Sequence, residues 1–161
     1  MDKNFIYGLA RVRKGDKTIG YIEKGSWDWG GTKQETEDVF AEQVPNASVL
    51  TLITKGGTIS PTFNLIQLNY ENIHEVAGGE LVGTAGNYTG WKAPTETVIM
   101  EDEWSIDFVS GQTMTIHKGV ILANLGGKLT LTEVSKMECQ LKVNMPSDGS
   151  TPYEINDTVE S

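Results

Sequence analysis

Only one stretch of this sequence predicts a helix, and it lies in the middle of a chain that otherwise predicts strands. Four apolar residues recur there at helical spacing, namely Tyr70, Ile73, Val76 and Ala77. Asn69 precedes them as an N-cap, because its side-chain oxygen accepts a hydrogen bond from a free backbone N–H of the first turn. Gly78 and Gly79 supply the positive φ that ends many helices. A helix of about residues 70–77 must bury its apolar stripe against a sheet, which limits the fold to a mixed architecture dominated by strands.

The most regular strand pattern runs from Lys136 to Met145. Apolar residues occupy every second position of this stretch, at Met137, Cys139, Leu141, Val143 and Met145. Polar residues occupy the positions between them. Because side chains alternate between the two faces of a strand, this pattern predicts a strand with one face in a core and one in solvent.

Shorter apolar runs separated by turn residues predict many further strands. The expected strands are 4–12, 18–22, 48–54, 58–68, 81–82, 88–91, 97–100, 104–108, 113–117 and 120–123. Lys55-Gly56-Gly57-Thr58 is expected to form a hairpin turn, and residues 101–103 are expected to form another turn. The pattern predicts a mainly β fold, a β-sandwich or barrel with one short flanking α-helix. We expect a single domain over residues 1–146 and a polar, acidic C-terminal tail over 147–161.

Residues 23–46 are polar and rich in glycine, and they show no clear periodicity. A segment of this length without periodicity is usually a functional loop or a mobile arm, and the alternative is a disordered surface loop. Its apolar residues are Trp27, Trp29, Val39 and Phe40. Large aromatic residues in a loop tend to mark a contact surface. Trp27 and Trp29 would alternatively stack against a sugar ring.

The 161 residues carry a formal net charge of −9, which disfavours nucleic-acid binding because phosphate contacts need clustered Lys and Arg. The single cysteine, Cys139, allows no intrachain disulfide. The N-terminal residues lack the apolar core of a secretory signal, and no run is long enough to cross a bilayer. We therefore expect synthesis and folding in a reducing cytoplasm, without membrane anchoring.

Candidate catalytic groups are scattered along the sequence. His74 and His117 belong to no metal-ligand spacing, and Cys139 lies within an apolar strand face, where cysteine usually acts as a small hydrophobic residue. Paired carboxylates at 101–103 would suit glycoside hydrolysis, but a solvated turn explains them better. The glycines match no phosphate-binding loop or dinucleotide fingerprint. We expect no enzymatic activity, no metal and no cofactor.

The order of these elements resembles the major tail tube protein of long-tailed phages. The resemblance covers about residues 4–146. It rests on the strand–helix unit Phe63–Gly79, on Trp91-Lys92-Ala93-Pro94 and on the alternating strand Met137–Met145. It implies a β-sandwich or barrel whose copies form hexameric rings. The rings stack into a hollow tube, the virion tail tube, assembled in the host cytoplasm, through which the genome is delivered.

The resemblance also implies partners. The chain itself is the main partner. A tape measure protein, a tail terminator, baseplate or tail-tip proteins and, in a contractile tail, a sheath protein would be the others. Phage DNA would pass without specific binding. The long loop would reach a neighbouring subunit, which makes Trp27, Trp29, Val39 and Phe40 candidate contact residues, since buried aromatics contribute much of the binding energy at interfaces.

An acidic channel would repel phosphate. The candidates to line it are the carboxylates expected on exposed strand faces and turns, namely Asp107, Glu138, Glu101, Asp102 and Glu103. The alternative function is a carbohydrate- or peptide-binding β-sandwich that uses Trp27, Trp29 and Trp91. A third hypothesis, an enzyme of another type, requires a polar pocket of converging titratable groups.

Overall fold

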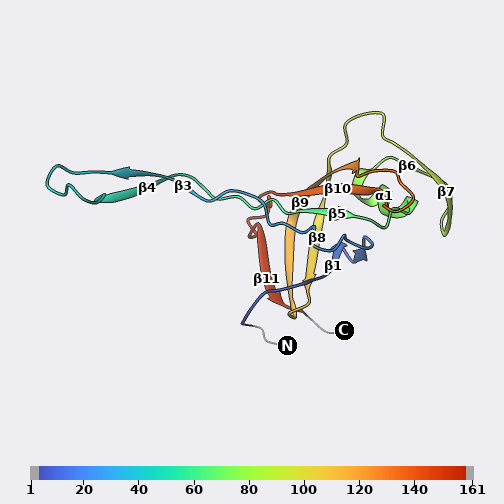
Figure 1. Cartoon of the computed structure of the whole chain (residues 1–161), viewed down its shortest axis with the longest axis horizontal. Coiled ribbons are helices and arrows are strands. Elements are labelled where there is room, and N and C mark those ends of the chain that lie inside the picture. Colours follow the sequence, from blue (N-terminus) through green and yellow to red (C-terminus); the bar gives the residue numbers. More distant parts are fainter. Residues whose placement is uncertain (1–3, 159–161) are drawn as a thin grey trace.

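The computed structural model describes residues 4–158 (Figure 1). This part contains one helix, α1 (Tyr70–Ala77), and eleven strands. The strands are β1 (Leu9–Lys14), β2 (Lys17–Thr18), β3 (Glu35–Val39), β4 (Leu50–Lys55), β5 (Thr62–Leu65), β6 (Glu80–Thr84), β7 (Asn87–Lys92), β8 (Met100–Phe108), β9 (Gln112–Gly126), β10 (Lys136–Val143) and β11 (Tyr153–Asp157). The prediction of a mainly β fold with one short helix is confirmed. Residues 1–3 of the predicted domain and 159–161 of the predicted tail lie outside the described residues.

Seven strands form one antiparallel sheet in the order β2-β1-β8-β9-β10-β5, with β11 also paired to β9. Two separate hairpins, β3-β4 and β6-β7, complete the described strands. The main sheet ends at β2 on one side and at β5 on the other, so the described strands form an open sheet rather than a closed barrel.

The 15-residue strand β9 organises this sheet. Its first half pairs with β11, and its second half pairs with β10, whereas β8 lies along both halves. Figure 1 shows β8, β11 and the first half of β9 running down the picture, while β10 and β5 run across it. The sheet therefore bends, and the bend coincides with a register shift between Asp102 and Trp104 of β8. Gly119 allows the close packing there, because an added Cβ would lie 2.9 Å from Cδ1 of Trp104.

The core lies inside this bend, beneath α1. Its fully buried side chains come from β1, β5, α1, β8, β9 and β10 and include Val12, Phe63 and Leu65, Val76, Trp104 and Ile106, Met114 and Ile116, Met137 and Leu141. The alternating pattern of β10 predicted this burial correctly for Met137, Cys139 and Leu141. The strand ends at Val143, however, and Met145 is 64% exposed, so the last two residues of the prediction were wrong.

Helix α1 has the predicted bounds and caps. Asn69 Oδ1 accepts a hydrogen bond from the backbone N–H of Asn72 at 2.9 Å, as an N-cap does. Gly78 has φ +74°, a conformation that favours glycine, and ends the helix. Nε1 of Trp91 donates to the Gly78 carbonyl at 2.7 Å, which ties the helix end to β7.

Both N-terminal strands are shorter than predicted. β1 begins at Leu9, and Phe5 and Tyr7 are exposed rather than buried. β2 ends at Thr18 instead of Ile22. Glycines with positive φ explain both differences, because Gly8 (+73°) and Gly20 (+111°) turn the backbone out of the extended conformation.

The structure corrects both predicted turns. Residues 55–58 form no hairpin turn. β4 pairs with β3, the strand before it in the sequence, and Thr58 forms a bridge with Thr32. The predicted loop 23–46 thus includes a strand, β3. Residues 101–103 are part of β8, and 97–99 lie outside any described strand. Glu101 and Asp102 pair with Val120 and Gly119, and this pairing extends β8 through the predicted turn.

The prediction of a C-terminal tail is wrong for residues 153–157. They form β11, which pairs with β9 from Gln112 to Ile116. Thr158 Oγ1 lies 2.8 Å from Thr113 Oγ1 and adds a side-chain contact. The sequence after Pro146 is polar because β11 is an exposed edge strand, and only Tyr153 and Ile155 are apolar within it.

Candidate self-assembly surface

Residues 31–58 form a long projection, here called the arm, that leaves the body of the molecule (Figure 1). It consists of β3, β4 and the chain around them. Thr32 and Thr58 join its two sides at the base, with reciprocal backbone N···O distances of 3.1 and 2.9 Å. Glycine is required at this narrow base, because a Cβ on Gly31 would lie 2.1 Å from the Thr58 carbonyl oxygen. The sequence between these points therefore folds as a hairpin outside the body.

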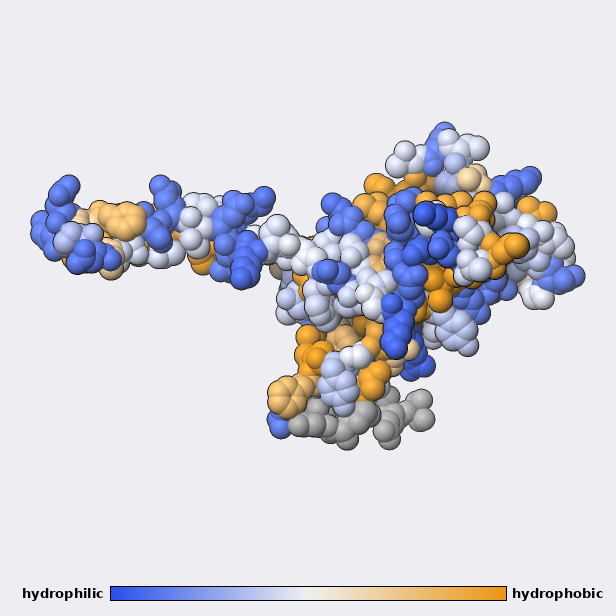
Figure 2. Space-filling view, in the orientation of Figure 1, coloured by the Kyte–Doolittle hydropathy of each residue, from blue (hydrophilic) through white to orange (hydrophobic). Residues whose placement is uncertain are grey.

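One face of the arm carries an apolar stripe. Residues directly opposite in an antiparallel pair share a face, so Val39 lies beside Leu50, and two residues further along, Leu52 lies beside Glu37. Val39, Leu50 and Leu52 are 38%, 53% and 47% exposed. Apolar and charged residues therefore occur side by side on the arm (Figure 2). A two-stranded hairpin is marginally stable in water by itself, and this one leaves its apolar stripe uncovered.

The connection between β3 and β4 extends this apolar surface. Phe40 is 68% exposed, and Val44 and Val49 are 40% and 51% exposed. The sequence from Gln34 to Thr54 also contains four carboxylates and no Lys or Arg. The carboxylates are Glu35, Glu37, Asp38 and Glu42. The outer arm is therefore both apolar and acidic.

At the base of the arm, aromatic side chains pack against the body. The ring of Trp27 stacks on Phe63 with a centroid distance of 5.5 Å and an interplanar angle of 16°. Trp29 meets Trp27 edge-on at 5.5 Å and Phe108 at 5.9 Å. Trp27 is partly buried against the core, whereas Trp29 is 39% exposed.

A groove of about 610 Å³ opens beside these rings. We call it the aromatic groove; its lining includes Tyr7, Leu9, Tyr21, Trp27, Trp29 and Phe108. Arg11, Glu23 and Lys24 also line it and place charges near its apolar wall. The buried Nε1 of Trp27 has no hydrogen-bond partner within the described residues. The groove wall is thus aromatic and also carries charged side chains.

The four predicted contact residues fall into two groups. Trp27 and Trp29 lie at the base and line the aromatic groove, whereas Val39 and Phe40 lie on the outer arm. The sequence pattern did not reveal Tyr21, which is 72% exposed beside the tryptophans. An aromatic residue in a predicted strand gave no signal that its side chain would stay outside the core.

The predicted acidic residues do not share one environment. Glu101, Asp102 and Glu103 lie on β8 and Glu138 lies on β10, and all four are exposed. Asp107 is only 4% exposed, which contradicts its prediction as an exposed carboxylate. It alternates with core residues along β8, as predicted, but arginines of β1 cover it on the opposite face of the sheet.

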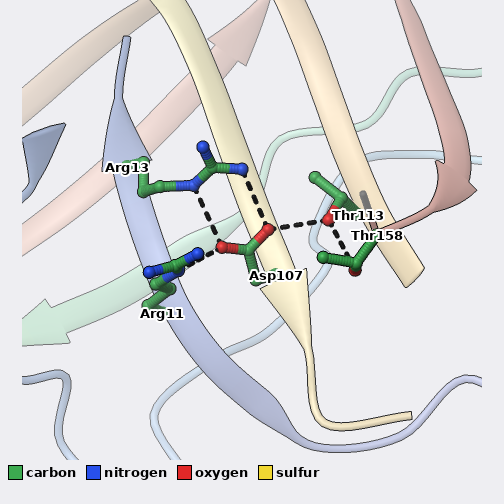
Figure 3. Close-up of polar contacts among 5 residues, drawn as sticks. All are labelled: Arg11, Arg13, Asp107, Thr113 and Thr158. Carbon is green, nitrogen blue, oxygen red and sulfur yellow. Dashed lines mark hydrogen bonds and ion pairs between the residues drawn. The ribbon is translucent and has the colours of Figure 1, made fainter. Parts of the chain in front are cut away.

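Asp107 and its partners form the cluster shown in Figure 3. Arg11 Nε donates to Oδ2 of Asp107, and Arg13 Nη2 donates to Oδ1 at 3.0 Å. Thr113 Oγ1 also donates to Oδ1, at 2.7 Å, and contacts Thr158. Burial alone would raise the pKa of Asp107, but the hydrogen bonds from Arg11, Thr113 and Arg13 outweigh it and lower the pKa. The sequence analysis did not identify Arg11 and Arg13, whose two-residue spacing on β1 places both on one face of the strand.

The remaining candidates for chemistry lie apart. His117 lies 3.7 Å from both Glu103 and Glu154, and His74 is half-buried on α1 rather than solvent-facing. Cys139 is buried, and burial raises the pKa of its thiol to about 12. Residues 4–158 contain no group of three or more His, Cys, Asp or Glu side chains placed to hold a metal ion. Over the same residues, no helix has the length and apolar character needed to span a bilayer.

Comparison with protein-family models and with curated proteins finds no match to this chain. The candidate site is therefore defined by its geometry alone. Two surfaces stand out, the apolar and acidic outer arm and the aromatic groove at its base.

Proposed function

We propose that this chain is a structural subunit that assembles with copies of itself into stacked rings, a tube of the kind found in phage tails. The observation that carries this proposal is the arm, whose apolar stripe is left exposed by residues 4–158. Solvent-exposed apolar side chains on a projecting hairpin gain free energy only when a partner covers them, roughly 25 cal/mol for each Å² removed from water.

The main sheet offers a second surface for assembly. β11 pairs with β9 on one side, and no described strand covers its other side. β2 pairs with β1 at Arg13 and Lys14, and the Ile19 N–H donates to the Val12 carbonyl, which leaves the beginning of β1 open. Open strand edges attract further strands. Because these edges differ in sequence, pairing between them is heterologous, and heterologous pairing produces a ring when the rotation closes.

The charge of the chain agrees with a conduit for DNA. A net charge of −9 opposes tight binding of phosphate, so DNA passing through such a tube would slide rather than bind. The proposed ring is hexameric by resemblance to tail tube proteins. Tape measure, terminator, tail-tip and sheath proteins would be partners by the same resemblance, and the assembled location would be the virion tail.

Negative-stain electron microscopy across a concentration series, with light scattering alongside, tests the proposal. We expect rings or hollow tubes of uniform width that become more abundant as the protein concentration rises. A monomer at every concentration would contradict self-assembly by this chain alone.

The aromatic groove favours one alternative, a binding module for a sugar or a peptide. Ligand sites are typically concave, with a volume of about 300–1,000 Å³ and aromatic walls, and the groove meets this description with Trp27 and Trp29. Trp91 does not line this groove, and its Nε1 donates a hydrogen bond to the Gly78 carbonyl at the end of α1. A monomer whose tryptophan fluorescence shifts with added glycans would favour this alternative.

A further inference from the structure

We infer that the aromatic groove of one copy receives the outer arm of another copy, with Phe40 entering the groove. This inference rests on the proposed self-assembly and names the two surfaces that meet. The arm supplies a large, 68% exposed aromatic side chain next to its apolar stripe. The groove supplies about 610 Å³ of space beside Trp27 and Trp29.

An arm cannot reach the groove of its own chain. The groove lies at the arm's base, because Trp27 and Trp29 immediately precede it in sequence. Phe40 lies eight residues beyond the base at Thr32. At about 3.3 Å per residue, an extended strand carries it roughly 26 Å away. Figure 1 shows the arm continuing outward from the body rather than folding back.

Charge favours the same pairing. Beyond Glu35, which lies opposite Lys55, the outer arm carries Glu37, Asp38 and Glu42, and no Lys or Arg lies between Gln34 and Thr54. Arg11 and Lys24 line the groove with Glu23. Arg11 shares the single carboxylate of Asp107 with Arg13, so that cluster keeps a net positive charge. Glu23 itself is paired with Lys136 at 3.0 Å. The groove therefore presents positive charge where an acidic hairpin would lie.

The groove wall also suits an aromatic ring. Trp29 lines the groove and is 39% exposed, so an incoming phenyl ring can pack against it. Another strongly exposed apolar segment, with Leu129 and Leu131, connects β9 to β10 and does not line the aromatic groove.

The outer arm of one copy contacts the groove of a second copy, and the arm of the second copy can contact a third in the same way. Each copy then offers one free arm and one free groove, so the interface is heterologous and builds rings or filaments. This geometry predicts cross-linked ladders rather than dimers when the two surfaces are joined covalently.

Disulfide trapping tests the inference. The double variant Ala41→Cys/Tyr21→Cys places one thiol on the arm beside Phe40, which is kept, and one at the groove, and Cys139 stays buried and unreactive. Under mild oxidation we expect a ladder of dimers, trimers and larger species on a non-reducing gel. The matched control, Ala41→Cys/Leu131→Cys, keeps the arm thiol and moves the other to the β9–β10 connection.

The expected yield of cross-linked species is about tenfold or more above the control, because docking holds the thiols at a millimolar effective concentration. A second variant, Lys24→Glu, reverses a groove charge and should lower assembly about two- to fivefold relative to Lys92→Glu, since an interface charge changes association modestly.

The outcomes separate the two proposals. A ladder from the groove pair alone supports the inference. Assemblies seen by scattering without this ladder, or a ladder from the Leu131 pair, overturn the inference and leave self-assembly standing. A monomer with no ladder at any concentration overturns both.

Discussion

Asp107 shows how one residue joins three strands. Its carboxylate binds Arg11 and Arg13 of β1 and Thr113 of β9, across the full width of β8. The arginines differ in exposure, at 53% for Arg11 and 23% for Arg13, so solvent screens the first pair more than the second. The cluster stabilises the polar face of the sheet opposite the core.

Replacing Asp107 with Asn should therefore destabilise the fold. The change leaves two guanidinium groups without their carboxylate, which costs about 1–3 kcal/mol of unfolding free energy. Urea denaturation monitored by tryptophan fluorescence would measure it. Glu96→Gln is the matched control, because it removes one negative charge from an exposed position. Equal midpoints for the two variants would contradict a stabilising role for the cluster.

The pH dependence of this effect follows from the pKa. Asp107 has a lowered pKa in the folded state, below its ordinary 3.8. A lowered carboxyl pKa contributes stability that is present above the unfolded value and is lost as pH falls through the folded value. The difference in unfolding free energy between wild type and Asp107→Asn should have its full value at neutral pH and should shrink below about pH 4. A difference that stays constant down to pH 2 would contradict this cause.

Cys139 is expected to be inert in the folded chain. Its thiol is buried and its pKa is raised to about 12, so almost no thiolate exists at pH 8. A chromogenic thiol reagent should react slowly with native protein and rapidly in urea. The Phe40→Cys variant, with an exposed thiol, provides the fast native control. Rapid reaction of wild-type protein without urea would show that β10 opens readily.

At the scale of elements, β11 decides where the domain ends. A chain that stops at Pro146 loses five residue pairs along β9 and the Thr113–Thr158 contact. We expect this truncation to lower the unfolding free energy by roughly 2 kcal/mol or more. Each strand hydrogen bond contributes about 1 kcal/mol, and the lost chain entropy of the ordered strand offsets part of the sum. An unchanged urea midpoint would mean that β11 adds no stability.

The arm is expected to be the least protected element of the free chain. Its strands pair with each other and expose their apolar side chains, and such regions open at little cost in free energy. Amide exchange in residues 35–55 should be fast in the monomer and slow in the assembly. Amides of β9 inside the sheet serve as the slow reference in both states. Equally slow exchange of the arm in both states would contradict ordering on assembly.

At the scale of the whole molecule, net charge opposes assembly. Copies that each carry −9 repel one another, and salt screens this repulsion over a Debye length of about 10 Å at 0.1 M. Raising NaCl from about 20 to 200 mM should lower the concentration at which assemblies appear in light scattering. The local attraction between arm and groove weakens too, but it involves fewer charges. Assembly that salt inhibits would mean that local ion pairs dominate.

Local sequence determined the elements whose residues interact with near neighbours. Asn69 and Gly78 set the ends of α1, because a cap acts within one turn. The alternation of Met137, Cys139 and Leu141 set the buried face of β10. These signals are local. A cap depends on the backbone conformation of a few residues, and a buried face depends on the spacing of apolar residues within one strand. Hence the mainly β class with one helix was predictable.

Only the tertiary structure decided which strand edges meet and which side chains a distant residue covers. The sequence predicts Asp107 to be an exposed carboxylate, but Arg11 and Arg13, nearly a hundred residues away, bind it and cover it. The sequence predicts the polar residues 153–157 to be a tail, but they form a strand because β9 supplies their hydrogen-bond partners. The groove between Tyr21, Trp27 and Phe108 likewise has no local signal. Side-chain burial and strand pairing are long-range, since the free energy of each depends on partners that sequence spacing alone does not specify.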